Sequence, residues 1–428
     1  MSTVLTMEAK ANERVSASAD LEKPRPRILL LTPYTGGNLG DGAIQDAIIH
    51  HLRLRLSEPQ IRLITLAPRM TSKLHGLPSF PIGKSSCDDD VASLPTSRLG
   101  RMRRELGHWL VAFRLLKETD LLVMSGGGQI DDYWGGAMGH PYALFKWAFM
   151  ARLCKARVVF LSVGVCSLTS RLGRAFAHRA LRLAAYRSYR DHGSKELLHE
   201  AAFTRTDPEF PDLAFSHPCA QQESLVARSG SGTQLVVGVS PMVYLSPQSS
   251  WPESDAKVYA GYVQMLCEFS EQVLEAGHTV VLFTSSLMDR RAVEDLEAKL
   301  RQSPKSASWA GRLRRLEQTC VNELLAEMRE MDVVVASRLH GIILSHLLGK
   351  PALAISYDRK VRAHAEDMGQ ERFCLDLRGC TSRQLMDSLA RLGSEADKIS
   401  ASIRARVKER SQKLESQYDL LAGMVSAA

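Results

Sequence analysis

Several features that would mark a membrane-spanning or secreted, disulfide-stapled protein are missing from the chain. No apolar run is long enough for a transmembrane helix, and no signal peptide is recognisable. The eight cysteines are dispersed, without a C-x-x-C pair or zinc-ligand spacing. We therefore expect reduced, mostly buried thiols, a cytoplasmic protein and no metal site.

Nucleotide and nucleic-acid signatures are missing too. There is no G-x-G-x-x-G fingerprint and no G-K-[ST] P-loop. Lys and Arg (55) exceed Asp and Glu (47), giving a formal net charge of +8, but no basic stripe is interleaved with aromatics. The nearest cluster, Arg101, Arg103 and Arg104, is interpreted as a solvated helix face. The basic excess suits anionic small molecules or an anionic membrane surface, and no nucleic-acid partner is expected.

The length of 428 residues favours two domains. Residues 1–23 are polar and aperiodic, and residues 216–233 are polar and rich in Ser and Gln. These stretches predict the following parts: a disordered tail over 1–23, an N-terminal Rossmann-like domain over 24–220 with a long loop at 69–100, a C-terminal Rossmann-like domain over 230–390, and a terminal helix over 391–428.

Two Gly-rich turns follow apolar strands in the first half. Residues 33–41 follow a predicted strand at 28–32, and Asp41 is predicted to N-cap the next helix. Such a turn either binds phosphate or sugar, or is simply tight. The second turn, 125–136, follows a strand at 120–124. It carries acids and aromatics that either bind a sugar acceptor or anchor the loop. Its candidate residues are Asp131, Tyr133, Trp134 and, slightly later, His140.

Arg190 ends a predicted strand at 186–190, and Ser194 is predicted to N-cap the helix that follows. An arginine at the carboxyl end of a strand is placed to bind an anionic ligand. The same side chain could equally form a structural salt bridge.

The most informative stretch is residues 331–361, which predicts a βαβ unit. Arg338 and His340 fall where the first strand ends and the helix begins, a position that favours anions. A loop with Tyr357, Asp358 and Lys360 follows the second strand and should open on the same edge. An anionic ligand handled by acid–base chemistry is indicated. The alternative is that Arg338 and His340 only cap the helix.

Strands and helices alternate through both halves, without a short-period repeat. The expected fold class is therefore α/β, with two Rossmann-like domains facing a central cleft.

An ordered set of motifs resembles the polysaccharide pyruvyl transferases over roughly residues 27–370. The motifs are N-x-G-D (Asn38, Gly40, Asp41), a GGG loop followed by Asp131, R-D-x-x-S (Arg190, Asp191, Ser194), and S-R-L-H-G…G-K-P…Y-D-x-K at 337–360. The resemblance implies a fold like the two-domain glycosyltransferase B (GT-B) type. It also implies transfer of a pyruvyl group from phosphoenolpyruvate onto two hydroxyls of a sugar, which forms a ketal.

The resemblance implies a phosphoenolpyruvate site made by Arg190, Arg338, Leu339 and His340, to which we add Lys360. Two guanidiniums can clamp a phosphate and a carboxylate. His340 is the expected general acid for the methylene carbon. The expected acceptor-binding or site-lining residues are Asn38, Asp41, Asp131, Tyr133, Trp134, His140 and Asp358.

No cofactor or metal is expected, since phosphoenolpyruvate is itself the donor. The acceptor is expected to be an exopolysaccharide or its lipid-linked precursor, with peripheral contact at the inner membrane face. Two alternatives stay open: a GT-B glycosyltransferase that uses a nucleotide sugar, and a non-catalytic polysaccharide-assembly protein.

Overall fold

The computed structural model describes residues 25–84, 86–88, 97–133, 135–166, 168–220, 234–249 and 253–426. The predicted tail at 1–23 and residues 221–233 of the predicted domain boundary lie outside these ranges. The strands on either side of that boundary, which end at Tyr189 and begin at Val236, belong to different sheets.

Six parallel strands of the described chain form the sheet of the first domain, in the order β3-β2-β1-β4-β5-β6. Apolar runs buried on both faces, such as Leu121–Ser125, explain the strands at the centre of this sheet. The strands are β1 (Arg27–Leu31), β2 (Gln60–Thr65), β3 (Ser79–Pro81), β4 (Leu121–Ser125), β5 (Arg157–Val163) and β6 (Tyr186–Tyr189). The helices are α2 (Leu39–Arg55), α3 (Pro68–His75), α4 (Arg98–Lys117), α5 (His140–Leu153), α6 (Arg171–Leu183) and α7 (His192–Glu200), with 3-10 turns η2 (Gly136–Met138), η3 (Leu213–Ser216) and η4 (Pro218–Ala220).

The second domain repeats this topology in its described part, with parallel strands in the order β12-β11-β10-β7-β8-β9. Its strands are β7 (Val236–Ser240), β8 (Thr279–Leu282), β9 (Leu313–Arg315), β10 (Val333–Ala336), β11 (Ala352–Ser356) and β12 (Cys374–Asp376). Its helices are α8 (Ala256–Glu275), α9 (Arg290–Gln302), α10 (Val321–Arg329), α11 (Leu339–Leu347), α12 (Arg359–Asp367) and α13 (Ser382–Ser394), with 3-10 turns η5 (Leu287–Asp289), η6 (Ser306–Trp309) and η7 (Glu371–Phe373). In each sheet the order reverses between two central strands, the position where open α/β sheets bind ligands.

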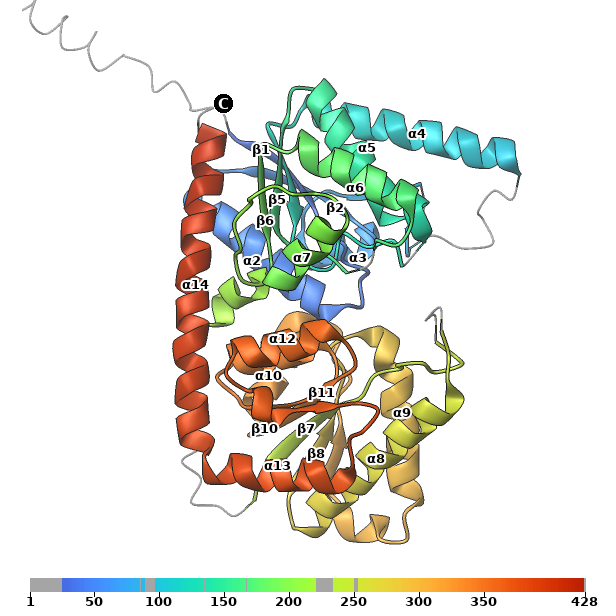
Figure 1. Cartoon of the computed structure of the whole chain (residues 1–428), viewed down its shortest axis with the longest axis vertical. Coiled ribbons are helices and arrows are strands. Elements are labelled where there is room, and N and C mark those ends of the chain that lie inside the picture. Colours follow the sequence, from blue (N-terminus) through green and yellow to red (C-terminus); the bar gives the residue numbers. More distant parts are fainter. Residues whose placement is uncertain are drawn as a thin grey trace, which may run out of the picture.

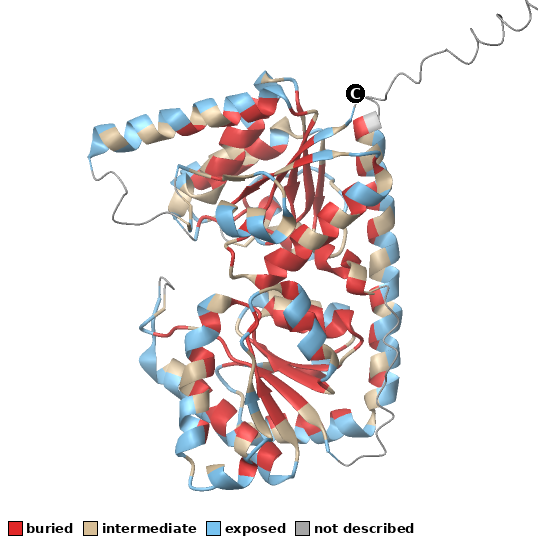
Figure 2. Cartoon of the chain, turned by 180° about the vertical axis from the view of Figure 1, so that it is seen from behind, coloured by how far each residue is buried: buried red, intermediate tan, exposed pale blue. Residues whose placement is uncertain are grey.

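The final helix, α14 (Ala396–Ser426), runs along both domains (Figure 1). Near its start, Arg404 packs against Gly349 of the second domain. Near its end, the buried amide of Gln417 bonds Ser162 and Ser188 of the first sheet at 3.0 and 2.6 Å. Buried residues fill both sheets and the inner side of this helix (Figure 2). The helix thus ties the two domains together.

Backbone hydrogen bonds also join the domains. The N–H of Leu39 donates to the carbonyl of Ser285 at 2.9 Å, and the N–H of Leu287 donates to that of Gly37 at 2.7 Å. The first Gly-rich turn therefore contacts the second domain directly. No described helix combines the length and the apolar character needed to cross a bilayer.

Two sequence predictions were wrong at this level. The predicted loop at 69–100 contains most of α3 and all of β3, and α4 begins before it ends. Pro68 at the first helical position starts α3, and left-handed Gly76 ends it. The cysteines are all free, but only Cys219, Cys267 and Cys374 are buried. The others lie at least partly exposed at helix ends and in loops.

Candidate active site

Two adjoining cavities lie between the domains. The larger has a volume of about 870 Å³ and the smaller about 360 Å³. Loops at the carboxyl ends of first-domain strands line one side, and the starts of α11 and α12 line the other. Six residues line both cavities, so the two share a wall: Arg190, Asp191, Gly193, Arg359, Lys360 and Ala363.

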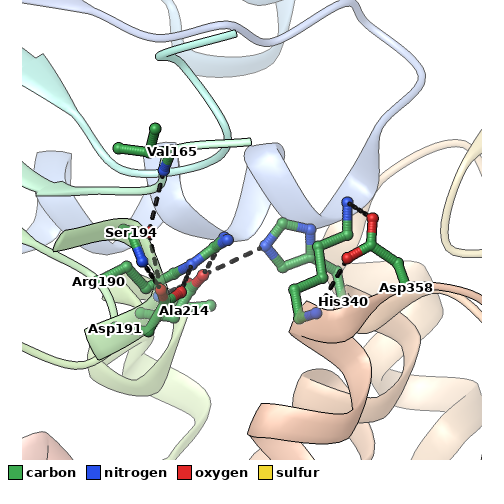
Figure 3. Close-up of polar contacts among 9 residues, drawn as sticks. Val165, Arg190, Asp191, Ser194, Ala214, His340 and Asp358 are labelled. Atoms are coloured by element: carbon green, nitrogen blue, oxygen red, sulfur yellow. Dashed lines mark hydrogen bonds and ion pairs between the residues drawn. The ribbon is translucent and has the colours of Figure 1, made fainter. Parts of the chain in front are cut away.

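Asp212, which lines the larger cavity, links side chains from the two domains. Its Oδ2 lies 3.2 Å from Nη1 of Arg190 and 3.5 Å from Nε2 of His340 (Figure 3). Its Oδ1 accepts a hydrogen bond from the backbone N–H of Ala214 at 3.0 Å, which holds the carboxylate at the start of η3. Asp212 was not among the residues predicted from the sequence. The available signal was a Pro-Asp pair, which is typical of turns.

The pKa values of two buried carboxyls in this region are shifted in opposite directions. Burial alone would raise the pKa of Asp212, but the adjacent imidazole of His340, and then the charge of Arg190, lower that pKa well below its usual range. Burial raises the pKa of Asp41 to about 6, although His340 opposes the increase. Asp212 therefore stays ionised, whereas Asp41 titrates near neutral pH.

Arg190 is the buried cation that the first domain contributes. Its Nε donates to Oδ2 of Asp191 at 3.1 Å, in addition to the contact with Asp212. A Cβ added to Gly164 would come within 2.8 Å of Nη2 of Arg190, so the guanidinium fits only against a glycine. Burial lowers the pKa of Arg190. The negative charges of Asp212 and Asp191 raise the pKa by more than burial lowers it, so the net change is upward.

Asp191, and not the predicted Ser194, is the N-cap of α7. Its Oδ1 accepts from both the backbone N–H and the hydroxyl of Ser194, each at 2.7 Å. The prediction was wrong because the helix begins three residues earlier than expected from Ser194 as a cap. Ser194 instead uses its hydroxyl oxygen to accept from the backbone N–H of Val165 at 3.0 Å, which fixes the loop after β5 (Figure 3).

His340 lies in the first turn of α11 and contacts the first turn of α2. A Cβ added to Gly40 would overlap its imidazole ring, so the two domains meet closely here. The side chain is 13% exposed. His340 itself lines neither cavity. Asp212, which it contacts, and Leu339, which precedes it in the chain, both line the larger cavity.

Asp41 also lies in the first turn of α2, so its predicted role as an N-cap was wrong. Asn38 is the cap, and its Oδ1 accepts from the backbone N–H of Gly40 at 3.2 Å. Nδ2 of Asn38 donates to Oδ2 of Asp41 at 2.6 Å. A Cβ on Gly127 would come within 2.9 Å of Oδ1 of Asp41, so the two predicted Gly-rich turns meet at this carboxyl.

Lys360 belongs to the first turn of α12, where the sequence analysis predicted a loop. Asp358 caps that helix by accepting from the backbone N–H of Lys360 at 2.9 Å, and its Oδ2 lies 3.7 Å from Nζ. Burial lowers the pKa of Lys360, while Tyr357, Cys166 and Asp358 raise it, with a net upward change. Lys360 and Arg190 thus present two cations from opposite domains to the shared wall.

Arg338 lies beside this region and is held by a buried carboxylate of the second domain. Its Nε and Nη2 donate to the two oxygens of the fully buried Asp289 at 2.6 and 2.9 Å. It lines neither cavity, whereas the neighbouring Leu339 lines the larger one. Donor binding by Arg338 stays a prediction, and the structure adds a bidentate ion pair as a second role.

The second Gly-rich loop contributes to the smaller cavity. Asp131 and Tyr133 line it, and Oδ1 of Asp131 accepts from the backbone N–H of Tyr133 at 2.8 Å. His140 starts α5 and lines neither cavity, and burial lowers its pKa. Trp134 lies outside the described residues. The smaller cavity further contains aromatic and acidic side chains of the second domain: Tyr244, Glu253, Tyr357 and Asp358.

A pair of neighbouring histidines beside the larger cavity was also not predicted. Nε2 of His364, a lining residue, lies 3.1 Å from Nδ1 of His346. Burial, and then the charge of Arg410, lower the pKa of His364 to about 3. His364 is thus a neutral residue of the cavity wall. His340, in contrast, lies next to the ionised carboxylate of Asp212.

Comparisons with known proteins bear on the fold and the family. The family model described as Polysaccharide pyruvyl transferase matches residues 38–359. No curated protein gives a significant match. UDP-GlcNAc 2-epimerase from Methanocaldococcus jannaschii has a TM-score of 0.56 at 11% identity, covering 85% of this chain and 92% of that one. MurG from Acinetobacter baumannii has a TM-score of 0.53 at 12% identity, covering 92% and 99%.

UDP-GlcNAc 2-epimerase from Neisseria meningitidis is similar in the same way, with a TM-score of 0.57 at 10% identity, covering 92% of this chain and 99% of that one. At such identities the likeness establishes the fold alone. It confirms the predicted GT-B-like architecture of two Rossmann-like domains.

Proposed function

Because this chain belongs to the polysaccharide pyruvyl transferase family, we propose that it transfers a pyruvyl group from phosphoenolpyruvate onto two hydroxyls of a sugar, forming a ketal. The observation that carries the proposal is the meeting of Arg190 and His340, from different domains, on the ionised Asp212 beside a cavity of about 870 Å³. An anion site next to an acid–base group is what this reaction requires.

The donor is held by Arg190 and Lys360. Phosphoenolpyruvate carries a phosphate and a carboxylate, and two cations on opposite sides of the shared wall match these two charges. The Arg190 side chain is only 7% exposed and that of Lys360 30%, so both are partly shielded from water, which strengthens their charge interactions. Relative movement of the domains would then change the separation of the two cations and adjust the site to its donor.

The proton required by the reaction comes from His340. It is added to the methylene carbon of the enol ester, which makes C2 electrophilic. One sugar hydroxyl attacks C2, phosphate leaves, and the second hydroxyl closes the ketal. Of the two hydroxyl protons, one replaces the proton that His340 delivered and the other leaves with phosphate.

Asp212 and Asp41 support this proton transfer in different ways. Asp212 is permanently ionised and orients the imidazole of His340. Asp41, whose pKa is raised to about 6, is suited to accept the proton of one hydroxyl and to pass it on to the leaving phosphate. Two carboxyls whose pKa values are shifted in opposite directions are typical of acid–base sites.

The acceptor sugar is placed in the smaller cavity. Tyr133, Tyr244 and Tyr357 offer flat faces for the C–H face of a sugar ring, while Asp131 and Asp358 offer acceptors for its hydroxyls. The acceptor is the exopolysaccharide or its lipid-linked precursor. The shared wall lets hydroxyls in this cavity reach a donor bound by Arg190 and Lys360.

The direct test incubates the protein with phosphoenolpyruvate and glycan acceptors, and follows phosphate release and acceptor mass. A pyruvylated product with equimolar phosphate is expected. Release of UDP from UDP-sugars, without phosphate release from phosphoenolpyruvate, would instead assign the chain to the nucleotide-sugar glycosyltransferases. Failure to bind phosphoenolpyruvate by calorimetry, with no turnover of either donor, would favour a non-catalytic role.

His340→Asn tests the assignment of the acid. We expect kcat to fall by roughly 100-fold or more, because general acid catalysis contributes about 10²- to 10⁴-fold. The matched control is His199→Asn, since His199 is an exposed histidine of α7 that lines neither cavity. Near-normal turnover of His340→Asn would remove the acid assignment.

A further inference from the structure

Helix α4 presents an apolar stripe to solvent. Its members recur at intervals of three and four residues, so they lie on one face of the helix. The opposite face packs into the first domain through His108, Ala112, Leu115 and Leu116, all buried. The stripe is therefore not the edge of the core. It comprises Leu99, Met102, Leu106, Leu110 and Phe113, each between 40% and 59% exposed.

The stripe continues onto α5. The ring of Trp109 meets the ring of Phe149 edge-on, with 6.3 Å between their centroids. Phe149 is itself partly exposed, and Leu153 at the end of α5 is 60% exposed. Contiguous apolar surface of this kind, in contrast to scattered single residues, marks a binding surface.

The helices of this layer are rich in basic residues. α4 contains six Arg and Lys residues against one Glu, and α6 contains four Arg against no acid. These two helices, both packed on α5, thus have a net charge of +9. The whole chain has a net charge of +8, so the remainder of the protein is almost neutral. The entire basic excess lies on one layer of the first domain.

Both views place this layer on the side of the first domain away from α14 (Figures 1 and 2). No contact with α14 or with the second domain therefore competes for it. The region lies outside the two cavities, whose lining includes no residue of α4, α5 or α6.

We propose that α4, extended by the ends of α5 and α6, docks the protein on an anionic lipid bilayer, with the stripe inserted at the interface and the arginines against the headgroups. Exposed Leu, Met and Phe on one face, together with arginines on the same helix, are the pattern of helices that lie in a membrane surface. Anionic lipids complement a face on which the positive charge of the chain is concentrated.

A second copy of the chain fits this surface less well. A two-fold interface would bring the same arginines of both copies together, and like charges repel at short range. A bilayer instead supplies opposite charge and an apolar layer at once. The proposal goes beyond the proposed function and does not depend on it, because vesicle binding is measured without any substrate.

The test is co-sedimentation of the full chain with vesicles of phosphatidylcholine, alone or mixed equally with phosphatidylglycerol. We expect binding to the anionic vesicles only, weakened by added salt. Leu106→Ser combined with Leu110→Ser should weaken binding by roughly tenfold or more, because two apolar side chains no longer enter the lipid. Arg103→Gln with Arg114→Gln should weaken it through charge alone.

Leu54→Ser on α2 is the matched control, because Leu54 is also an exposed helical leucine (64%) but lies near α14. It should bind as the unchanged protein does. Absence of binding to anionic vesicles, or equal binding by the double-serine variant, would overturn the proposal. A dimer without lipid that the double-serine variant converts to monomers would assign the face to a second copy and overturn it as well.

Discussion

Asp41→Asn should make the protein more stable at neutral and alkaline pH. Burial raises the pKa of Asp41 from 3.8 to about 6. A carboxyl with a raised folded-state pKa holds its proton more firmly in the folded than in the unfolded chain. Raising the pH from about 4 to 6 therefore removes stability, and above pH 6 the whole penalty is present.

The size of this penalty follows from the shift. At about 1.4 kcal/mol per unit of pKa, the change corresponds to about 3 kcal/mol at pH 8 and about half of that at pH 5. The attraction of Asp41 to His340, Arg190 and Lys360 is already contained in the net shift. An asparagine carbonyl can still accept the 2.6 Å hydrogen bond from Asn38, so little else is lost.

The assay is urea unfolding of both proteins at pH 5 and pH 8. The variant should gain about 3 kcal/mol at pH 8 and about half as much at pH 5. Asp120→Asn is the control of opposite sign: burial of Asp120 is outweighed by its hydrogen bonds with Arg27, which lower its pKa, so this variant should be less stable at pH 8. A difference for Asp41→Asn that is zero, negative or independent of pH would refute the reasoning.

Three further substitutions have expected outcomes. Gly40→Ala should lower kcat by about tenfold or more, measured by phosphate release, because its Cβ displaces the ring of His340. Arg338→Ala should cost about 3–5 kcal/mol in urea unfolding, since it leaves the buried Asp289 without its ion-pair partner. Asp212→Asn should cost about 3 kcal/mol at pH 7, because a depressed carboxyl pKa adds stability above about pH 4 that is lost as the pH falls through the folded-state pKa.

Matched variants separate these effects from general damage. Gly261→Ala lies in α8 with open space around its added Cβ, so activity should not change. Arg291→Ala removes an exposed ion pair and should cost less than about 1 kcal/mol. Full activity of Gly40→Ala would contradict the first expectation. The second would be wrong if Arg338→Ala were as stable as Arg291→Ala. The third requires that the stability change of Asp212→Asn depends on pH in the acid range.

Local patterns predicted the elements around the site well. Residues 331–361 contain the predicted βαβ unit as β10, α11 and β11, and Gly349 follows the end of α11. An apolar run buried on both faces and a glycine in the left-handed region are local signals, so they are readable without the fold. Helix starts were less readable, as at Asp41 and Lys360, since several residues near a strand end can serve as caps.

By itself, the sequence determined two parallel sheets and the strand-end positions of Arg190 and His340. Only the tertiary structure decided that Asp212 joins these two side chains and that Arg338 turns to Asp289. It also decided that α14 returns to the first domain. Periodicity reports which residues are buried within one element. Which buried charges meet depends on how separate elements pack, and that information is spread over residues far apart in the chain.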